Sequence, residues 1–419
     1  MAQTLKERNA MLTKKRWIVL IASCIANLCI GGVYAWSVFA GPMADHLNRL
    51  HGTTLTAADL AYIFSFTTGV EFITSIAGGY LGKKIGADWV IRIGVVVFGL
   101  GFVVCGFSTT KLLLSIGFGL MCGLSGSFAY VCTISNSVKF FPDKKGLIGG
   151  ISTASYGLSA VVIPPIANFL NETVGVSKAF LIFGVVILVA GASSSLLIIN
   201  CPDDFLPDGM VNTSAQNDGR ADDYNALQML KTPIFYVMFF MLFIGASLGL
   251  MMISSASNIA QSMIGMTTTT AALIVSVLSL FNTAGRILCG AISDKLGRIN
   301  TLATVFVMAM VALLIMYISG ASVNKVLFCI GICLIGLCYG AFMGIYPGFT
   351  SDQFGTTYSS LNYGIMFVGF SAAGFAGPMI MQTVYNNQGT YRPAFLVAMI
   401  LAAAGLGISF LYRAMKKKA

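Results

Sequence analysis

Charge is scarce in this chain. Only 10% of the 419 residues are Asp, Glu, Lys or Arg, whereas soluble domains carry roughly a quarter. Apolar residues make up 57%, and runs of about 20 apolar residues recur from end to end, each long enough to cross the hydrocarbon core of a bilayer. The composition therefore excludes a soluble fold and predicts an all-α membrane protein.

Metal-binding and catalytic patterns are lacking too. The two histidines, His46 and His51, share one predicted loop, and the ten cysteines have no zinc-type CxxC spacing. Nearly all the cysteines lie inside apolar runs, where they are typical of small packing residues. Because no nucleophile–base set falls within the apolar runs either, we expect no metal, no cofactor and no enzymatic activity.

Acidic residues are outnumbered, 15 against 25 Lys and Arg, which gives a net charge of +10. The basic residues cluster beside the ends of the apolar runs, where membrane lipid and insertion topology explain them better than nucleic acid does. Nineteen lie in loops on the same side as the N-terminus, five lie in the opposite loops, and Arg286 lies inside a run. This asymmetry predicts a multi-pass protein of the cell membrane with both termini in the cytoplasm.

The apolar runs form two groups of six on either side of a polar stretch. They lie near residues 17–40, 59–80, 88–108, 111–137, 147–170 and 177–200, then 233–258, 268–292, 300–320, 325–348, 359–383 and 391–412. We expect a six-helix bundle over 1–200, a solvated cytoplasmic linker over 201–231 and a second six-helix bundle over 232–419.

Corresponding loops of the two halves share a pattern. The loop after the eighth run resembles the major facilitator superfamily signature G-x-x-x-D-[RK]-x-G-[RK], through Gly290, Asp294, Lys295, Gly297 and Arg298. The loop after the second run aligns on Gly79 and Gly86 but has Lys83 where the signature has Asp. The resemblance implies twelve transmembrane helices in two bundles, with the second loop serving as a gating loop.

Five further motifs resemble the oxalate:formate antiporter family. They are Tyr34-Ala-Trp36, Phe141-Pro142-Asp143-Lys144-Lys145-Gly146, Ser155-Tyr156-Gly157, Lys231-Thr232-Pro233 and Asn362-Tyr363-Gly364. The resemblance implies alternating-access transport of small carboxylates, by exchange or with protons, through a cavity between the bundles.

Two ionisable residues lie deep inside predicted spans. Arg286 is about 12 Å along the helix from Asp294, and an ionised side chain at this depth costs about 2.5–3.5 kcal/mol. Its planar guanidinium matches a carboxylate and stays protonated, and the resembling family carries a substrate-binding arginine here. Glu71 has comparable depth in the second span, where it could carry a coupled proton, pair with Arg286, join a helix contact or contact the substrate.

Aromatic residues complete the predicted substrate site: Tyr34, Trp36, Tyr130, Tyr156 and Tyr339. Their hydroxyl groups can bond a carboxylate while the rings exclude water, although many aromatic residues only pack or mark the membrane interface. Phe370 stands where the oxalate carrier pattern has a lysine. Because a second cation is missing, one charge of oxalate would stay unpaired, and we predict a monocarboxylate of the lactate, pyruvate, formate or acetate class.

Other functions stay open at this level. A carrier with the same fold could move oxalate, another anion or a drug, and a transport-related sensor is a further alternative. A channel would need a filter motif, and the sequence has no repeated one. The expected partners are a small organic anion, membrane lipid and, for symport, protons.

Overall fold

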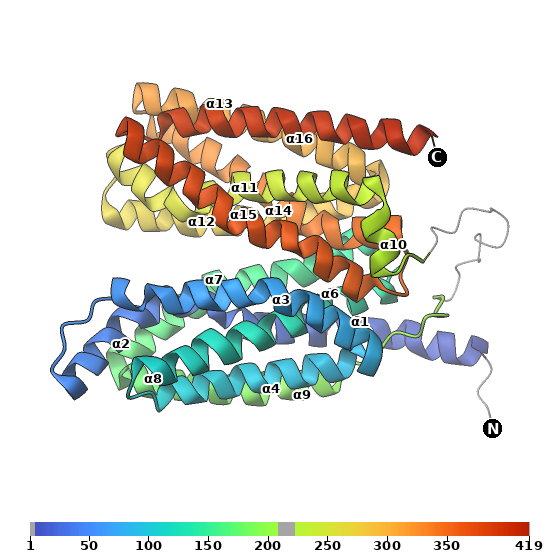
Figure 1. Cartoon of the computed structure of the whole chain (residues 1–419), viewed down its shortest axis with the longest axis horizontal. Coiled ribbons are helices and arrows are strands. Elements are labelled where there is room, and N and C mark those ends of the chain that lie inside the picture. Colours follow the sequence, from blue (N-terminus) through green and yellow to red (C-terminus); the bar gives the residue numbers. More distant parts are fainter. Residues whose placement is uncertain (1–4, 208–222, 419) are drawn as a thin grey trace. The chain divides into compact units, whose positions relative to one another are not determined.

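The computed structural model describes residues 5–207 and 223–418, and these form helices and loops without a β-strand (Figure 1). The first-half helices are α1 (Leu5–Ile30), η1 (Gly31–Ala35), α2 (Trp36–His51), η2 (Ala58–Leu60), α3 (Ala61–Ile85), α4 (Ala87–Gly106), α5 (Lys111–Leu114), η3 (Ser115–Cys122), α6 (Gly123–Phe140), α7 (Lys145–Val174), α8 (Val176–Val186), η4 (Ile187–Gly191) and α9 (Ala192–Leu196). The second-half helices are α10 (Ala226–Lys231), α11 (Pro233–Ser262), α12 (Thr268–Leu296), α13 (Arg298–Ser322), α14 (Lys325–Phe354), α15 (Ser359–Gln388) and α16 (Arg392–Lys418).

The predicted spans are confirmed as helices. Within the described chain, eleven helical segments are long and apolar enough to cross a membrane, and the first of them, Lys6–His51, joins α1, η1 and α2. The predicted second span is α3, which has 25 residues but is made less apolar by Glu71 and by its Thr, Ser and Gly residues. These eleven segments and α3 account for the twelve predicted spans.

Local sequence signals set several helix ends. Gly86 separates α3 from α4 with φ of 96°, and Gly297 separates α12 from α13 with φ of 85°. Glycine adopts this left-handed region without the steric cost of a Cβ atom, so the two corresponding loops turn in the same way. Thr267 caps α12 by accepting a bond from the Thr270 N–H, and Pro233 begins α11.

Glycines let α12 and α14 approach closely. On α14 they recur every four residues, at Gly336, Gly340, Gly344 and Gly348, which puts them on one face of the helix. A Cβ atom at Gly340 would lie 2.0 Å from the Asn282 carbonyl oxygen on α12. Such small-residue faces allow helix backbones to touch in a membrane, where the hydrophobic effect does not drive helices together.

By their contacts the residues form two compact units. Unit 1 comprises Met1–Asp143, Ser155–Asp223 and Gly355–Ile365, and unit 2 comprises Lys144–Ala154, Tyr224–Phe354 and Met366–Ala419. The start of α7 therefore groups with second-half helices, and the start of α15 groups with first-half helices. The proposed domain limits at 200 and 232 stay a prediction.

The start of the linker differs from the expectation of a solvated segment. Cys201 is 1% exposed and Phe205 is 8% exposed. Asn136 of α6 holds this segment, accepting from the Cys201 N–H at 2.9 Å and donating to the Ile199 carbonyl at 2.9 Å. The middle of the predicted linker, residues 208–222, lies outside the described residues.

Candidate functional site

Arg286 is buried in the second half of α12, with 4% of its surface exposed. Its Nε donates to Oδ1 of Asn282 at 3.2 Å, and its Nη1 donates to the main-chain carbonyl of Thr153 on α7 at 2.6 Å. Both acceptors are neutral. Within residues 5–207 and 223–418, no acidic side chain forms an ion pair with Arg286.

Three glycines fix the position of the Arg286 backbone. A Cβ atom would lie 2.2 Å from the Arg286 carbonyl oxygen if added at Gly150 and 2.1 Å if added at Gly344. At Gly340 it would lie 2.8 Å from the Arg286 nitrogen. Because these distances exclude any side chain, α7 and α14 both press directly against α12 at this residue. All of these residues belong to unit 2.

This arrangement leaves a buried positive charge whose recorded hydrogen bonds go to neutral groups. A guanidinium carries five N–H donors in a planar fork, and two of them make the recorded bonds to Asn282 and Thr153. A carboxylate would add the opposite charge that neither acceptor supplies, and charge-assisted hydrogen bonds are about twice as strong as neutral ones. The chemistry of the site therefore favours a carboxylate.

Three of the predicted tyrosines come together in unit 1. The ring of Tyr156 on α7 lies 5.4 Å from that of Tyr34 on η1 and 4.6 Å from that of Tyr130 on α6, measured between centroids. Trp36 instead packs on Phe118, with centroids 4.5 Å apart, and is 5% exposed. The structure thus brings Tyr34, Tyr130 and Tyr156 into one aromatic cluster.

The other two predicted aromatic residues lie in unit 2. Tyr339 on α14 is 4% exposed, and its ring covers α11 so closely that a Cβ atom at Gly249 would lie 2.2 Å from it. Phe370 on α15 stacks on Phe367, with ring centroids 4.6 Å apart and planes 23° from parallel. Phe370 is half-buried, and its neighbouring ring gives it an apolar setting.

Glu71 lies near the middle of α3 and is half-buried. It belongs to unit 1, whereas Arg286 belongs to unit 2. Proton coupling, pairing with Arg286, a helix contact and substrate contact all stay predictions for this residue.

The residues of the predicted gating loop have defined partners in unit 2, although Gly290, Asp294 and Lys295 lie in the last turns of α12, Gly297 forms the turn and Arg298 begins α13. The Asp294 carboxylate accepts from the main-chain N–H groups of Gly146 at 2.8 Å and Leu147 at 2.9 Å, in the first turn of α7. Arg298 pairs with Asp294 at 2.7 Å and with Asp352 of α14 at 2.9 Å. The acid thus caps α7 at the end where a helix dipole favours negative charge.

The rest of the gating loop divides into packing and exposed residues. A Cβ atom at Gly290 would lie 2.3 Å from the Gly146 carbonyl oxygen, so this glycine permits the close approach of α7. Gly297 supplies the turn described above. Lys295 is exposed, and no ion pair of Lys295 is found among the described side chains.

Some groups of the site were not predicted from the sequence. Asn282 lies four residues before Arg286 on the same helix, a spacing that places the two side chains together, so this signal was available. The Thr153 carbonyl carries no such signal, because any residue has one. Lys145 pairs with Asp352 at 2.9 Å and adds a second basic partner for that acid.

No group of three or more His, Cys, Asp or Glu side chains in the described part of the chain is placed to hold a metal ion.

The long apolar helices define a helical multi-pass membrane protein. The family model of the Major Facilitator Superfamily matches residues 17–378. The chain therefore belongs to the Major Facilitator Superfamily.

Characterised and uncharacterised relatives agree with this family. The chain is 30% identical to the uncharacterised MFS-type transporter YhjX of Escherichia coli, over 85% of each chain. It is 27% identical to the oxalate:formate antiporter of Oxalobacter formigenes, over 93% of this chain and 89% of that one. Mouse monocarboxylate transporter 12 is 23% identical over 96% of this chain and 86% of its own length.

A solved structure has the same fold. The transporter FucP, crystallised in its outward conformation, superposes with a TM-score of 0.67 and covers 93% of this chain and 98% of its own. The two sequences are 17% identical, so this likeness concerns the fold. These findings make the protein a transporter and not an enzyme.

Proposed function

We propose that the protein is a secondary transporter of small monocarboxylates, of the lactate, pyruvate, formate or acetate class, and that Arg286 binds the carboxylate. Two helix bundles would alternate access to this central residue. Tyr34, Tyr130 and Tyr156, and Tyr339 from the other unit, would orient the anion through their hydroxyl groups.

One observation carries the proposal: the recorded partners of the buried Arg286 guanidinium are the neutral Asn282 and Thr153. A buried charge without an opposite partner is costly, and a bound anion removes that cost. Burial also excludes water, which strengthens the attraction between the guanidinium and a carboxylate.

Phe370 supports the choice of a monocarboxylate. It stacks on Phe367, and a dicarboxylate beside this apolar pair would have one carboxylate matched by Arg286 and one left unpaired. A monocarboxylate has no second charge that would need a partner.

Transport would run as anion exchange or as proton symport. An empty site with the charge of Arg286 would return across the membrane slowly unless that charge is neutralised. A second anion would do this in exchange. In symport, Glu71 would carry the proton in with the anion, and its carboxylate, once the proton is released, would supply the negative charge for the return. Both termini and the gating loop with Lys295 would lie on the cytoplasmic side of the cell membrane.

Uptake of labelled lactate, pyruvate, formate, acetate and oxalate into proteoliposomes tests the proposal. We expect uptake of at least one monocarboxylate, by exchange or with an inward proton gradient, and loss of this uptake in Arg286→Gln. Normal transport of every anion by that variant would refute the site.

Oxalate exchange is the second function to test, because the oxalate:formate antiporter aligns with 93% of this chain. Strong oxalate exchange by the wild-type protein, with little uptake of monocarboxylates, would overturn the argument from Phe370 and leave Arg286 as an oxalate site.

A further inference from the structure

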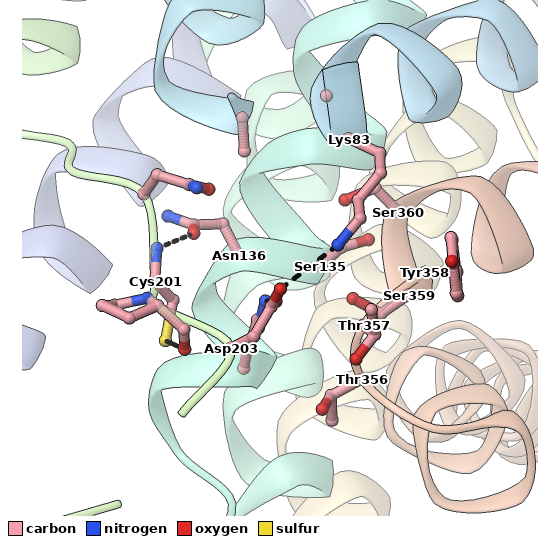
Figure 2. A pocket seen from close by; sticks show the side chains of 15 residues that line it. Lys83, Ser135, Asn136, Cys201, Asp203, Thr356, Thr357, Tyr358, Ser359 and Ser360 are labelled. Atoms are coloured by element: carbon pink, nitrogen blue, oxygen red, sulfur yellow. Dashed lines mark hydrogen bonds and ion pairs between the residues drawn. The ribbon is translucent and has the colours of Figure 1, made fainter. Parts of the chain in front are cut away.

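A polar pocket of about 300 Å³ opens within unit 1, and its lining includes none of Tyr34, Tyr130 and Tyr156 (Figure 2). Its walls come from the end of α3, the end of α6, the segment after α9 and the loop that leads into α15. The lining residues are Gly82, Lys83, Ala87, Ser135, Asn136, Lys139, Asn200, Cys201, Pro202, Asp203, Thr356, Thr357, Tyr358, Ser359 and Ser360. We call this cavity the lysine pocket.

Two lysines in the pocket share one carboxylate. Lys83 pairs with Oδ2 of Asp203 at 3.2 Å, and Lys139 pairs with Oδ1 of the same residue. These are the only charged side chains among the fifteen lining residues, so the lining carries one net positive charge. The pocket already binds a carboxylate, with one lysine on each oxygen.

The opposite wall adds hydrogen-bonding groups. Thr356, Ser359 and Ser360 contribute hydroxyl groups to this part of the lining (Figure 2). Just outside the lining, Asp223 accepts from the N–H groups of Thr356 at 2.9 Å and Thr357 at 3.1 Å. The hydroxyls of this wall can donate to an anion that the lysines hold.

Among the described side chains, Lys83 and Lys139 are the ion-pair partners of Asp203. Its side chain is 54% exposed, whereas that of Lys139 is 15% exposed. Burial raises the pKa of Asp203, but the hydrogen bonds and charges of Lys139 and Lys83 outweigh this and hold the pKa below its usual range. Asp203 is therefore ionised at neutral pH, and a free carboxylate could replace it without changing the chemistry at either lysine.

We propose that the lysine pocket binds a small free dicarboxylate between Lys83 and Lys139, and that Asp203 is a tethered competitor for this place. When Asp203 leaves, two positive charges remain, and a dianion neutralises both. Binding would break the ion pairs by which Asp203 ties the segment after α9 to α3 and α6, while the Asn136 hydrogen bonds to Ile199 and Cys201 would still hold the start of that segment. Lys83 is essential for this binding. The superfamily signature has an acid at the same position, and an acid there would repel a dicarboxylate.

The test measures how fast Lys83 and Lys139 are acetylated in the purified full-length protein, by mass spectrometry, with malonate as the probe. All variants carry Arg286→Gln, so that the central arginine does not contribute to anion binding. Asp203→Asn should speed acetylation of both lysines without malonate. Malonate should then protect both lysines in the Asp203→Asn variant. The malonate concentration that gives half-protection should be roughly tenfold lower in this variant than in the protein that keeps Asp203, because the tethered Asp203 carboxylate competes with malonate at a millimolar effective concentration.

Two controls make the result specific. Asp204→Asn removes the neighbouring acid, which pairs with Arg8 at 2.6 Å instead, and should leave both rates and the malonate response unchanged. Lys83→Gln should abolish the protection of Lys139, and a thermal unfolding curve checks that this variant is folded. Protection by chloride at equal ionic strength, protection by anionic lipid alone, or no protection in Asp203→Asn would each overturn the proposal.

Discussion

Nη1 of Arg286 donates a hydrogen bond to the main-chain carbonyl of Thr153 at 2.6 Å, and this bond joins the second half of α12 to the first part of α7. The same stretch of α7 is capped by Asp294 at its start. An anion that accepts the Nη1 hydrogen bond in place of the Thr153 carbonyl would break one of these two connections between α12 and α7. Binding at Arg286 would thus act directly on α7, a helix whose two parts belong to different units.

Arg286→Lys should lower carboxylate exchange by at least about tenfold. Lysine keeps the charge but presents a point charge in place of a planar fork, and loss of one charge-assisted hydrogen bond is worth about 1.5–3 kcal/mol. Counterflow in proteoliposomes measures the effect. Arg49→Lys, an exposed residue near the end of α2, serves as the matched control, and equal activity of both variants would contradict the prediction.

Phe370→Lys should shift selectivity toward dicarboxylates. The new cation could pair with the second charge of oxalate, so oxalate uptake should rise relative to lactate or formate uptake. The matched control is Phe375→Lys on the same helix, at a position that is 56% exposed. A shift of equal size in both variants would show that the added charge acts without regard to position.

Glu71→Gln should abolish uptake driven by a proton gradient and leave anion exchange intact, because glutamine cannot carry a proton. The measurement compares uptake at an imposed pH difference with counterflow at equal pH. Glu172→Gln, an exposed site on α7 whose Oε1 accepts from Asn168, should change neither. Unchanged proton coupling in Glu71→Gln would remove Glu71 from the mechanism.

Asp294→Asn should destabilise the protein by about 1 kcal/mol, the usual size of a helix-cap loss. The carboxylate bonds two N–H groups of α7 and pairs with Arg298, and asparagine keeps one acceptor oxygen without the charge. Thermal unfolding in detergent measures the change. Lys295→Gln alters the adjacent exposed residue and should have little effect; equal destabilisation would argue against a special role for the acid.

Gly344→Ala should cost about 1–3 kcal/mol through overpacking and should also slow transport. The added Cβ atom would lie 2.1 Å from the Arg286 carbonyl oxygen, so α14 must move away from α12. Gly407→Ala on α16 places a methyl group where no atom lies within 4 Å and should be tolerated. Wild-type stability of Gly344→Ala would show that these helices separate easily.

The number and order of the spans could be predicted from the sequence, because each apolar run is a local property that membrane solvent enforces. The turns at Gly86 and Gly297 were visible for the same reason. The burial of Cys201 and Phe205 could not be predicted from the sequence, because the polar residues around them are typical of a solvated loop. This burial depends on Asn136, which lies about 65 residues away.

The sequence by itself determined that this is a twelve-span membrane protein with one costly arginine inside a span. Only the tertiary structure decided what surrounds that arginine: the Thr153 carbonyl, and glycines from α7 and α14 that are far apart in the chain. It also decided that Lys83 meets Asp203. Such pairings depend on how helices pack against one another, and hydropathy, which is summed along one segment at a time, carries no information about them.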